Sequence, residues 1–76
     1  MSEPSTLDTK GLRCPLPVLK ARKALKELPA GATLRVLATD PGAIKDFEAF
    51  CKTTGYRLLS WSQTGEVLSF DIQKSN

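Results

Sequence analysis

The stretch Val67-Leu68-Ser69-Phe70-Asp71-Ile72-Gln73-Lys74 decides the fold of this chain. Leu68, Phe70 and Ile72 alternate with polar residues, which indicates a strand with one buried face and one solvated face. The chain has 76 residues, enough for one domain with a thin core, because a domain of this size buries only about 60% of its extended-chain surface. We therefore expect the helices to cover one face of a single sheet.

The segments before this strand show a succession of strand and helix patterns. The expected elements are a strand over 6–9, a helix over 15–28, a strand over 33–39, a helix over 41–54, a strand over 56–62, a hairpin turn over 63–65 and the closing strand over 67–74. Pro29 and Gly31 would end the first helix. Asp40 is a suitable N-cap for the second helix, with Pro41 at its first position. Gly55 is placed to close that helix.

The expected fold class is α+β. The order β-α-β-α-β-β predicts a two-layer α/β sandwich, with a four-stranded mixed sheet and two helices on one face. Residues 1–76 are expected to form one domain in which residues 1–5 are disordered. A monomer is the default expectation, and the final strand could be an exposed edge able to pair with another chain.

Composition and charge exclude several classes of function. No apolar stretch approaches the ~20 residues needed to span a membrane, and residues 1–6 lack the basic and apolar regions of a secretory signal. Two cysteines are too few for a disulfide scaffold, which favours the cytoplasm. With no histidine and only two cysteines, we expect no metal site, and the lack of histidine also excludes a Cys-His nucleophile. No cofactor is expected. The net charge of +3 hints at an acidic partner, but the few aromatic residues do not resemble a base-stacking platform, so direct nucleic-acid binding is not expected.

Cys14 is the residue best suited to chemistry. It is expected at the N-cap of the first helix, in the run Arg13-Cys14-Pro15-Leu16-Pro17. Pro15 and Pro17 are compatible with the first turn of a helix, where a missing N–H is tolerated. Together they would stiffen the chain and fix the direction in which the sulfur points.

The groups around Cys14 predict an activated thiol. The two prolines remove amides, so the N–H groups of Leu16 and Val18 would chiefly face the sulfur. The positive end of the helix dipole and the charges of Arg13 and Lys10 would favour thiolate over thiol. We therefore expect the pKa of Cys14 to lie below its ordinary value. The alternative is that Cys14 is a small buried hydrophobe, because C-x-P alone is a weak motif.

The first helix also presents a candidate docking surface. At about 100° per residue, Leu16 and Leu19 point away from the sheet, beside Lys20 and Lys23. Outward leucines ringed by lysines, next to a thiol, would suit a partner with an acidic and partly apolar surface. The alternative is that isolated surface leucines need no explanation.

Cys51 has a different expected role. It lies on the same helical face as Ile44 and Phe47, which favours core packing. If the two helices run parallel, Cys14 and Cys51 are offset by roughly 15 Å along the axis. A disulfide requires Cα atoms within about 7 Å, so a dithiol oxidoreductase is not expected.

These motifs resemble those of the TusA/SirA-like sulfur-carrier family, over nearly the whole chain. The C-P-x-P element, followed by a helix and then by A-T-D-P, is a specific signature. The matching residues are Leu7-Asp8, Gly11-Leu12, Cys14-Pro15-Leu16-Pro17-Val18-Leu19-Lys20, Arg22-Lys23-Ala24-Leu25, Gly31, Ala38-Thr39-Asp40-Pro41, Asp46, Phe50-Cys51, Gly55 and Phe70-Asp71-Ile72.

The resemblance implies a fold like that of the C-terminal domain of translation initiation factor three. It also implies that Cys14 accepts sulfane sulfur as a persulfide and acts as the co-substrate of a relay, a sulfurtransferase-type carrier. The donor would be a cysteine desulfurase or a rhodanese-like protein, and the acceptor a relay protein of the DsrE/TusD kind. The sulfur would serve tRNA thiolation, sulfur oxidation or cofactor assembly.

Two other classes of function remain open at this point. The chain could be a regulatory or interaction module without sulfur transfer, in which case loss of the Cys14 thiol would leave its effect intact. It could also be an RNA-binding module, which rests on fold analogy alone.

Overall fold

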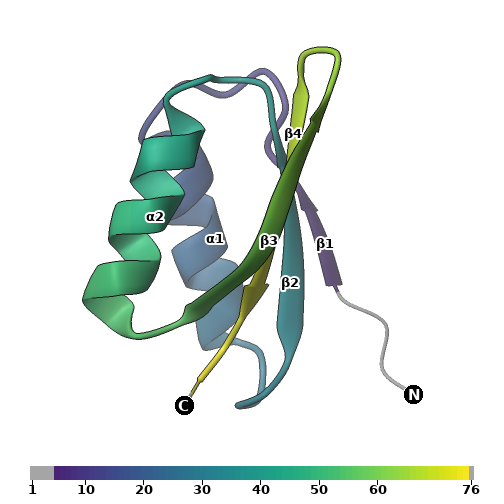
Figure 1. Ribbon diagram of the computed structural model, residues 1–76. Coiled ribbons are helices and arrows are strands. Elements are labelled where there is room, and N and C mark those ends of the chain that lie inside the picture. The colour runs from purple at the N-terminus through teal and green to yellow at the C-terminus, as the bar shows by residue number, and fades with distance from the viewer. Residues whose placement is uncertain (1–4, 76) are drawn as a thin grey trace.

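The computed structural model describes residues 5–75, in the expected order of strands and helices (Figure 1). The elements are β1 (Ser5–Asp8), α1 (Leu16–Lys26), β2 (Thr33–Ala38), α2 (Ala43–Thr54), β3 (Arg57–Thr64) and β4 (Val67–Gln73). The first strand begins at Ser5, one residue earlier than expected. The disorder expected for residues 1–5 is wrong at Ser5, which belongs to β1, and residues 1–4 lie outside the described residues.

The four strands form one mixed sheet in the order β1-β2-β4-β3. β1 pairs with β2 in parallel, with Leu7 opposite Val36. β4 pairs antiparallel with β2 on one side and with β3 on the other. The expectation that the final strand could be an exposed edge is therefore wrong, because the closing hairpin places β4 between β3 and β2. The edges of the sheet are β1 and β3.

Both helices lie on the same side of the sheet (Figure 1), which confirms the two-layer α+β fold. The alternation in β4 sets this arrangement, since Leu68, Phe70 and Ile72 are at most 2% exposed and face the helices. Phe47 of α2 stacks on Phe70, with ring centroids 4.7 Å apart. On the opposite face, Arg35 pairs with Asp71 at an Nε–Oδ1 distance of 2.9 Å.

The predicted and observed helix boundaries differ by one residue at the start of α1 and by two residues at the end of α1 and at the start of α2. α1 begins at Leu16 and ends at Lys26, where Glu27 caps it by donating its backbone N–H to carbonyls of the last turn. α2 begins at Ala43, because Asp40 holds the residues before it in a turn. The Asp40 carboxylate accepts the Gly42 N–H at 2.9 Å, and its carbonyl accepts the Ala43 N–H at 2.9 Å.

The glycines at the ends of α2 and β3 act as turn residues. Gly55 ends α2 with a φ of 82° and donates its N–H to the carbonyl of Cys51, as the helix-closing role predicts. β3 continues to Thr64, so the hairpin turn spans only Gly65 and Glu66, instead of residues 63–65. The positive φ of 61° at Gly65 is the backbone conformation that a two-residue hairpin loop requires.

Candidate functional site

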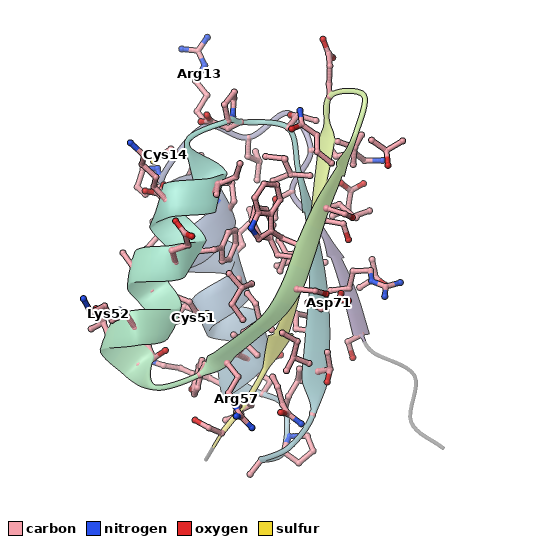
Figure 2. All side chains as sticks on the ribbon, in the orientation of Figure 1. Arg13, Cys14, Cys51, Lys52, Arg57 and Asp71 are labelled. Atoms are coloured by element: carbon pink, nitrogen blue, oxygen red, sulfur yellow. The ribbon has the colours of Figure 1, made fainter. Side chains whose placement is uncertain are left out.

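Cys14 lies in the connection between β1 and α1, at the end of the helical layer where α2 begins (Figure 2). Its side chain is exposed, so the alternative of a buried hydrophobe is wrong. The N-cap of α1 is Pro15, with a φ of −99°, and Cys14 precedes it. The prediction of Cys14 at the N-cap is therefore wrong by one residue.

The backbone around Cys14 forms a turn that engages one of the two amides expected to face the sulfur, that of Leu16. The Leu16 N–H donates to the carbonyl of Arg13 at 2.8 Å. It is therefore not available to a thiolate, contrary to the sequence-based prediction. Pro17 is buried in the first turn of α1, where the missing N–H of a proline is tolerated.

Two loops are tied together beneath Cys14. The Asp40 carboxylate accepts the Cys14 backbone N–H at 2.6 Å, and the Thr39 hydroxyl accepts the Gly11 N–H at 2.9 Å. Further back, Thr9 is fully buried and donates its hydroxyl to the carbonyl of Leu37 at 2.6 Å. These bonds fix the backbone of Cys14 relative to the start of α2.

The sulfur itself is held by a carboxylate from the second helix. The Cys14 Sγ donates its hydrogen bond to Oδ2 of Asp46, which lies in the first turn of α2. The Asp46 side chain therefore reaches from one helix to the thiol that precedes the other. Cys14 and Asp46 are 32 residues apart in the sequence.

This environment raises the pKa of Cys14, and the predicted lowering is wrong. The causes are the hydrogen bond to Asp46 first, then partial desolvation, then the negative charges of Asp46 and Asp40. A thiol that donates to a carboxylate loses that hydrogen bond on ionisation and gains a repulsion. The free protein therefore holds Cys14 as a thiol.

The two nearby cations interact with carboxylates other than Asp46. Lys10 pairs with Asp8 at an Nζ–Oδ2 distance of 3.8 Å. The pKa of Asp40 is lowered by the N–H groups of Cys14 and Gly42, with a smaller contribution from the charge of Arg13. Figure 2 shows the Arg13 side chain extending away from Cys14 at the same end of the molecule.

The expected docking residues are exposed on α1. Leu16 is 44% exposed and Leu19 is 51% exposed, and Lys20 and Lys23 are exposed beside them. A groove of about 390 Å³ runs between the two helices from Pro15 and Asp46. It is lined by Pro15, Val18, Arg22, Asp46, Ala49, Phe50, Thr53 and Thr54.

Cys51 belongs to the core, as predicted. It is 6% exposed, and burial raises its pKa to about 11. Both cysteines are free thiols. Among residues 5–75, no three side chains of the metal-ligating types are grouped so that they could hold an ion. No helix in the same range is long and apolar enough to cross a membrane.

Sequence reasoning missed the chemical role of the two carboxylates at Cys14. Asp40 was expected as a helix cap and, like Asp46, as one of the residues shared with a known family. An acidic residue in the first turn of a helix is ordinary, because it complements the helix dipole. No local signal connects Asp46 with a cysteine in another segment.

Comparisons with known proteins show the family and the fold of the chain. The model of the family described as "Sulfurtransferase TusA" matches residues 5–74. The chain is 49% identical over 69 residues to "Sulfur carrier protein TusA" of Allochromatium vinosum, covering 91% of each chain. It is 40% identical over 70 residues to the protein of the same name from Pseudomonas entomophila, covering 92% of this chain and 88% of that one. The crystal structure of a SirA-like protein from Desulfitobacterium hafniense superposes with a TM-score of 0.81 at 29% identity, covering 93% of this chain and 97% of that one.

Proposed function

The chain belongs to the TusA sulfurtransferase family and is a sulfur carrier, and we propose that it carries the sulfur as a persulfide on Cys14. The observation that carries this proposal is the contrast between the two thiols. Cys14 is exposed on a loop held by hydrogen bonds, whereas Cys51 is buried with a pKa of about 11. Only Cys14 can meet the cysteine of another protein.

Loading is a transfer of sulfane sulfur without net oxidation. Cys14 first loses its proton to solvent, because the thiolate is the attacking form. Its Sγ then attacks the outer sulfur of a donor persulfide, R–S–SH. A new S–S bond forms, the donor's S–S bond breaks, and the bonding electron pair leaves with the donor as R–S⁻. The products are Cys14–S–SH and a donor thiolate that takes up a proton.

Unloading reverses these roles. An acceptor thiolate attacks the outer sulfur of Cys14–S–SH, forming the acceptor persulfide and releasing the Cys14 thiolate, which is then reprotonated. The rate of this step depends on how well Cys14 leaves, and a thiol of lower pKa leaves faster. The groups that surround Cys14 therefore influence both transfers.

The other site residues support the thiol from its own loop and helix. Pro15 and Pro17 fix the direction of the chain at Cys14. Arg13 offsets part of the charge of Asp40, and Lys10 adds positive charge near the same loop while pairing with Asp8. We assign these residues to orienting Cys14 and moderating the negative charge around it.

The exposed face of α1 is the surface that we assign to partner recognition. Leu16 and Leu19 offer apolar contact, and Lys20 and Lys23 favour an acidic rim on the partner. The donor would be a cysteine desulfurase or a rhodanese-like protein, and the acceptor a relay protein of the DsrE/TusD kind. These partners place the carrier in the cytoplasm, with tRNA thiolation, sulfur oxidation or cofactor assembly as the destination of the sulfur.

Intact-mass spectrometry tests the assignment directly. After incubation with a cysteine desulfurase and cysteine, wild-type protein and Cys51→Ala should gain one sulfur atom, and Cys14→Ser should gain none. Peptide mapping should locate the added sulfur on Cys14. Equal loading of the Cys14→Ser variant would refute the proposal and leave an interaction module or an RNA-binding module to be considered.

A further inference from the structure

The immediate surroundings of Cys14 are acidic, although the protein as a whole has a net charge of +3. Asp46 accepts the thiol hydrogen bond, and Asp40 accepts the backbone N–H of the same residue at 2.6 Å. These carboxylates come from α2 and from the loop before it. The sulfur of Cys14 therefore lies beside two carboxylates, although the protein as a whole is basic.

Of the two carboxylates beside Cys14, Asp46 is the one whose negative charge is not offset by a cation in the described residues. Asp40 is already compensated by two backbone N–H groups and by Arg13. In the described chain the side-chain ion pairs are Lys10–Asp8 and Arg35–Asp71, so Asp46 has no such pair there. Arg22 of α1 lines the same groove as Asp46 without forming an ion pair with it. Asp46 therefore interacts with the thiol and is otherwise open to a visiting cation.

A carboxylate in this position opposes both steps of sulfur transfer. During loading it favours the thiol, which is not the attacking form. During unloading it destabilises the departing Cys14 thiolate, which makes Cys14 a poorer leaving group. Neutralising the charge of Asp46 removes both effects at once.

We propose that Asp46 makes the carrier selective for partners that place a cationic side chain beside their reacting cysteine. This inference rests on the proposed function. In the complex, the ammonium or guanidinium group pairs with the Asp46 carboxylate in place of the Cys14 thiol. The thiol then ionises to solvent and attacks, or leaves, next to a balanced pair of charges. Sulfur transfer between Cys14 and a thiol that lacks such a cation is slow, because the charge of Asp46 stays unpaired.

The structure supports this selectivity in two ways. Cys14 is exposed, and the groove that begins at Pro15 and Asp46 gives access to the carboxylate from outside. The cation would also act within a few ångströms of the sulfur, where an ionic interaction is least screened by salt. The lysines of α1 lie on a different part of the surface, so the partner would combine an acidic rim for α1 with a cation for Asp46.

Small thiols of different charge test the proposal without any partner protein. Carrier loaded on Cys14 is mixed with cysteamine, which is cationic, or with 3-mercaptopropionate, which is anionic, at equal thiolate concentration. Loss of the extra sulfur atom is followed by intact mass. Each thiolate attacks the outer sulfur, leaves as R–S–SH and releases the Cys14 thiolate. The ratio of the two rates is the selectivity.

The matched variants are Asp46→Asn and Glu48→Gln. Glu48 is an exposed carboxylate on the same helix, about 200° away around its axis. The ratio of the cysteamine rate to the 3-mercaptopropionate rate should be highest in proteins that keep the Asp46 carboxylate, because intrinsic differences between the two thiolates are the same for every variant. In Asp46→Asn that ratio should fall roughly two- to fivefold, the effect expected of one charge at an exposed site. Glu48→Gln should retain the wild-type ratio.

The outcomes separate this inference from the proposed function. If wild-type Cys14 acquires no sulfur at all, the proposed function fails before selectivity can be measured. If Cys14 loads normally but Asp46→Asn keeps the wild-type ratio, Asp46 does not select partners and only the inference is overturned. An equal fall in Glu48→Gln would also overturn it, because the effect would then reflect net charge and not the site.

Discussion

Replacing Phe47 by leucine should weaken the attachment of α2, the helix that carries Asp46, to the sheet. The Phe47 side chain is 0% exposed. Its ring centroid lies 4.7 Å from that of Phe70 and 6.4 Å from that of Phe50. Phe47→Leu removes these aromatic contacts while leaving an apolar residue of similar volume in the core.

The expected cost follows from these contacts. Volume-conserving apolar exchanges cost up to about 1.5 kcal/mol, and loss of an aromatic pair adds about 0.5–1.5 kcal/mol. We therefore expect the free energy of unfolding to fall by about 1–3 kcal/mol. A domain of this length is stabilised by about 4–11 kcal/mol, so the variant should fold. Phe47→Ala would cost about 3–5 kcal/mol and could leave too little stability to measure.

Urea unfolding followed by the fluorescence of Trp61 measures this loss, because the Trp61 ring lies 6.4 Å from Phe70 in the same packing layer. The midpoint should fall with an unchanged denaturant slope. Leu59→Ala is the control, since Leu59 is 51% exposed and should change stability by no more than about 0.5 kcal/mol. If Phe47→Leu were as mild as this control, Phe47 would not be what holds α2 on the sheet.

The remaining predictions concern the thiol, a helix end and the docking surface. The pH midpoint for alkylation of Cys14 by iodoacetamide should lie above that of an ordinary cysteine, because the hydrogen bond to Asp46 raises the pKa of Cys14. The midpoint should be lower in Asp46→Asn than in wild-type protein, and equal midpoints in the two proteins would contradict this reasoning. Gly55→Ala should lower the free energy of unfolding by about 1–2 kcal/mol, since Gly55 has a φ of 82°, and an equally stable variant in a urea titration would be inconsistent with that backbone. The double substitution Lys20→Glu and Lys23→Glu should slow the loading of Cys14 by a cysteine desulfurase, while the rate of Cys14 alkylation by iodoacetamide stays unchanged. A normal loading rate would exclude the exposed face of α1 from donor recognition.

The raised pKa of Cys14 protects the empty carrier from side reactions. A lowered pKa would leave a reactive thiolate exposed to any electrophile in solution. The hydrogen bond to Asp46 instead keeps the empty carrier as a thiol. Under our proposal, the reactivity of Cys14 then depends on which charged group approaches the Asp46 carboxylate.

Local patterns in the sequence were sufficient to predict the elements and to single out Cys14, the residue that we propose as the sulfur carrier. The alternation of Leu68, Phe70 and Ile72 predicted the buried face of β4, and the structure confirms it. The turn at Gly55 was also predicted, because it depends on the conformational freedom of one residue. Exposure of Leu16 and Leu19 followed from helical spacing alone. These features involve residues close together in the chain, and short-range geometry determines them.

Tertiary structure alone decided the strand order and the electrostatics of the site. β4 lies in the middle of the sheet because it pairs with both β2 and β3, and periodicity does not specify which strands become neighbours. Asp40 and Asp46 reach Cys14 across 26 and 32 residues of sequence. An ionic interaction depends on the distance between charges in space. The adjacent Arg13 and Lys10 therefore suggested a thiolate, whereas the distant carboxylates produce a thiol.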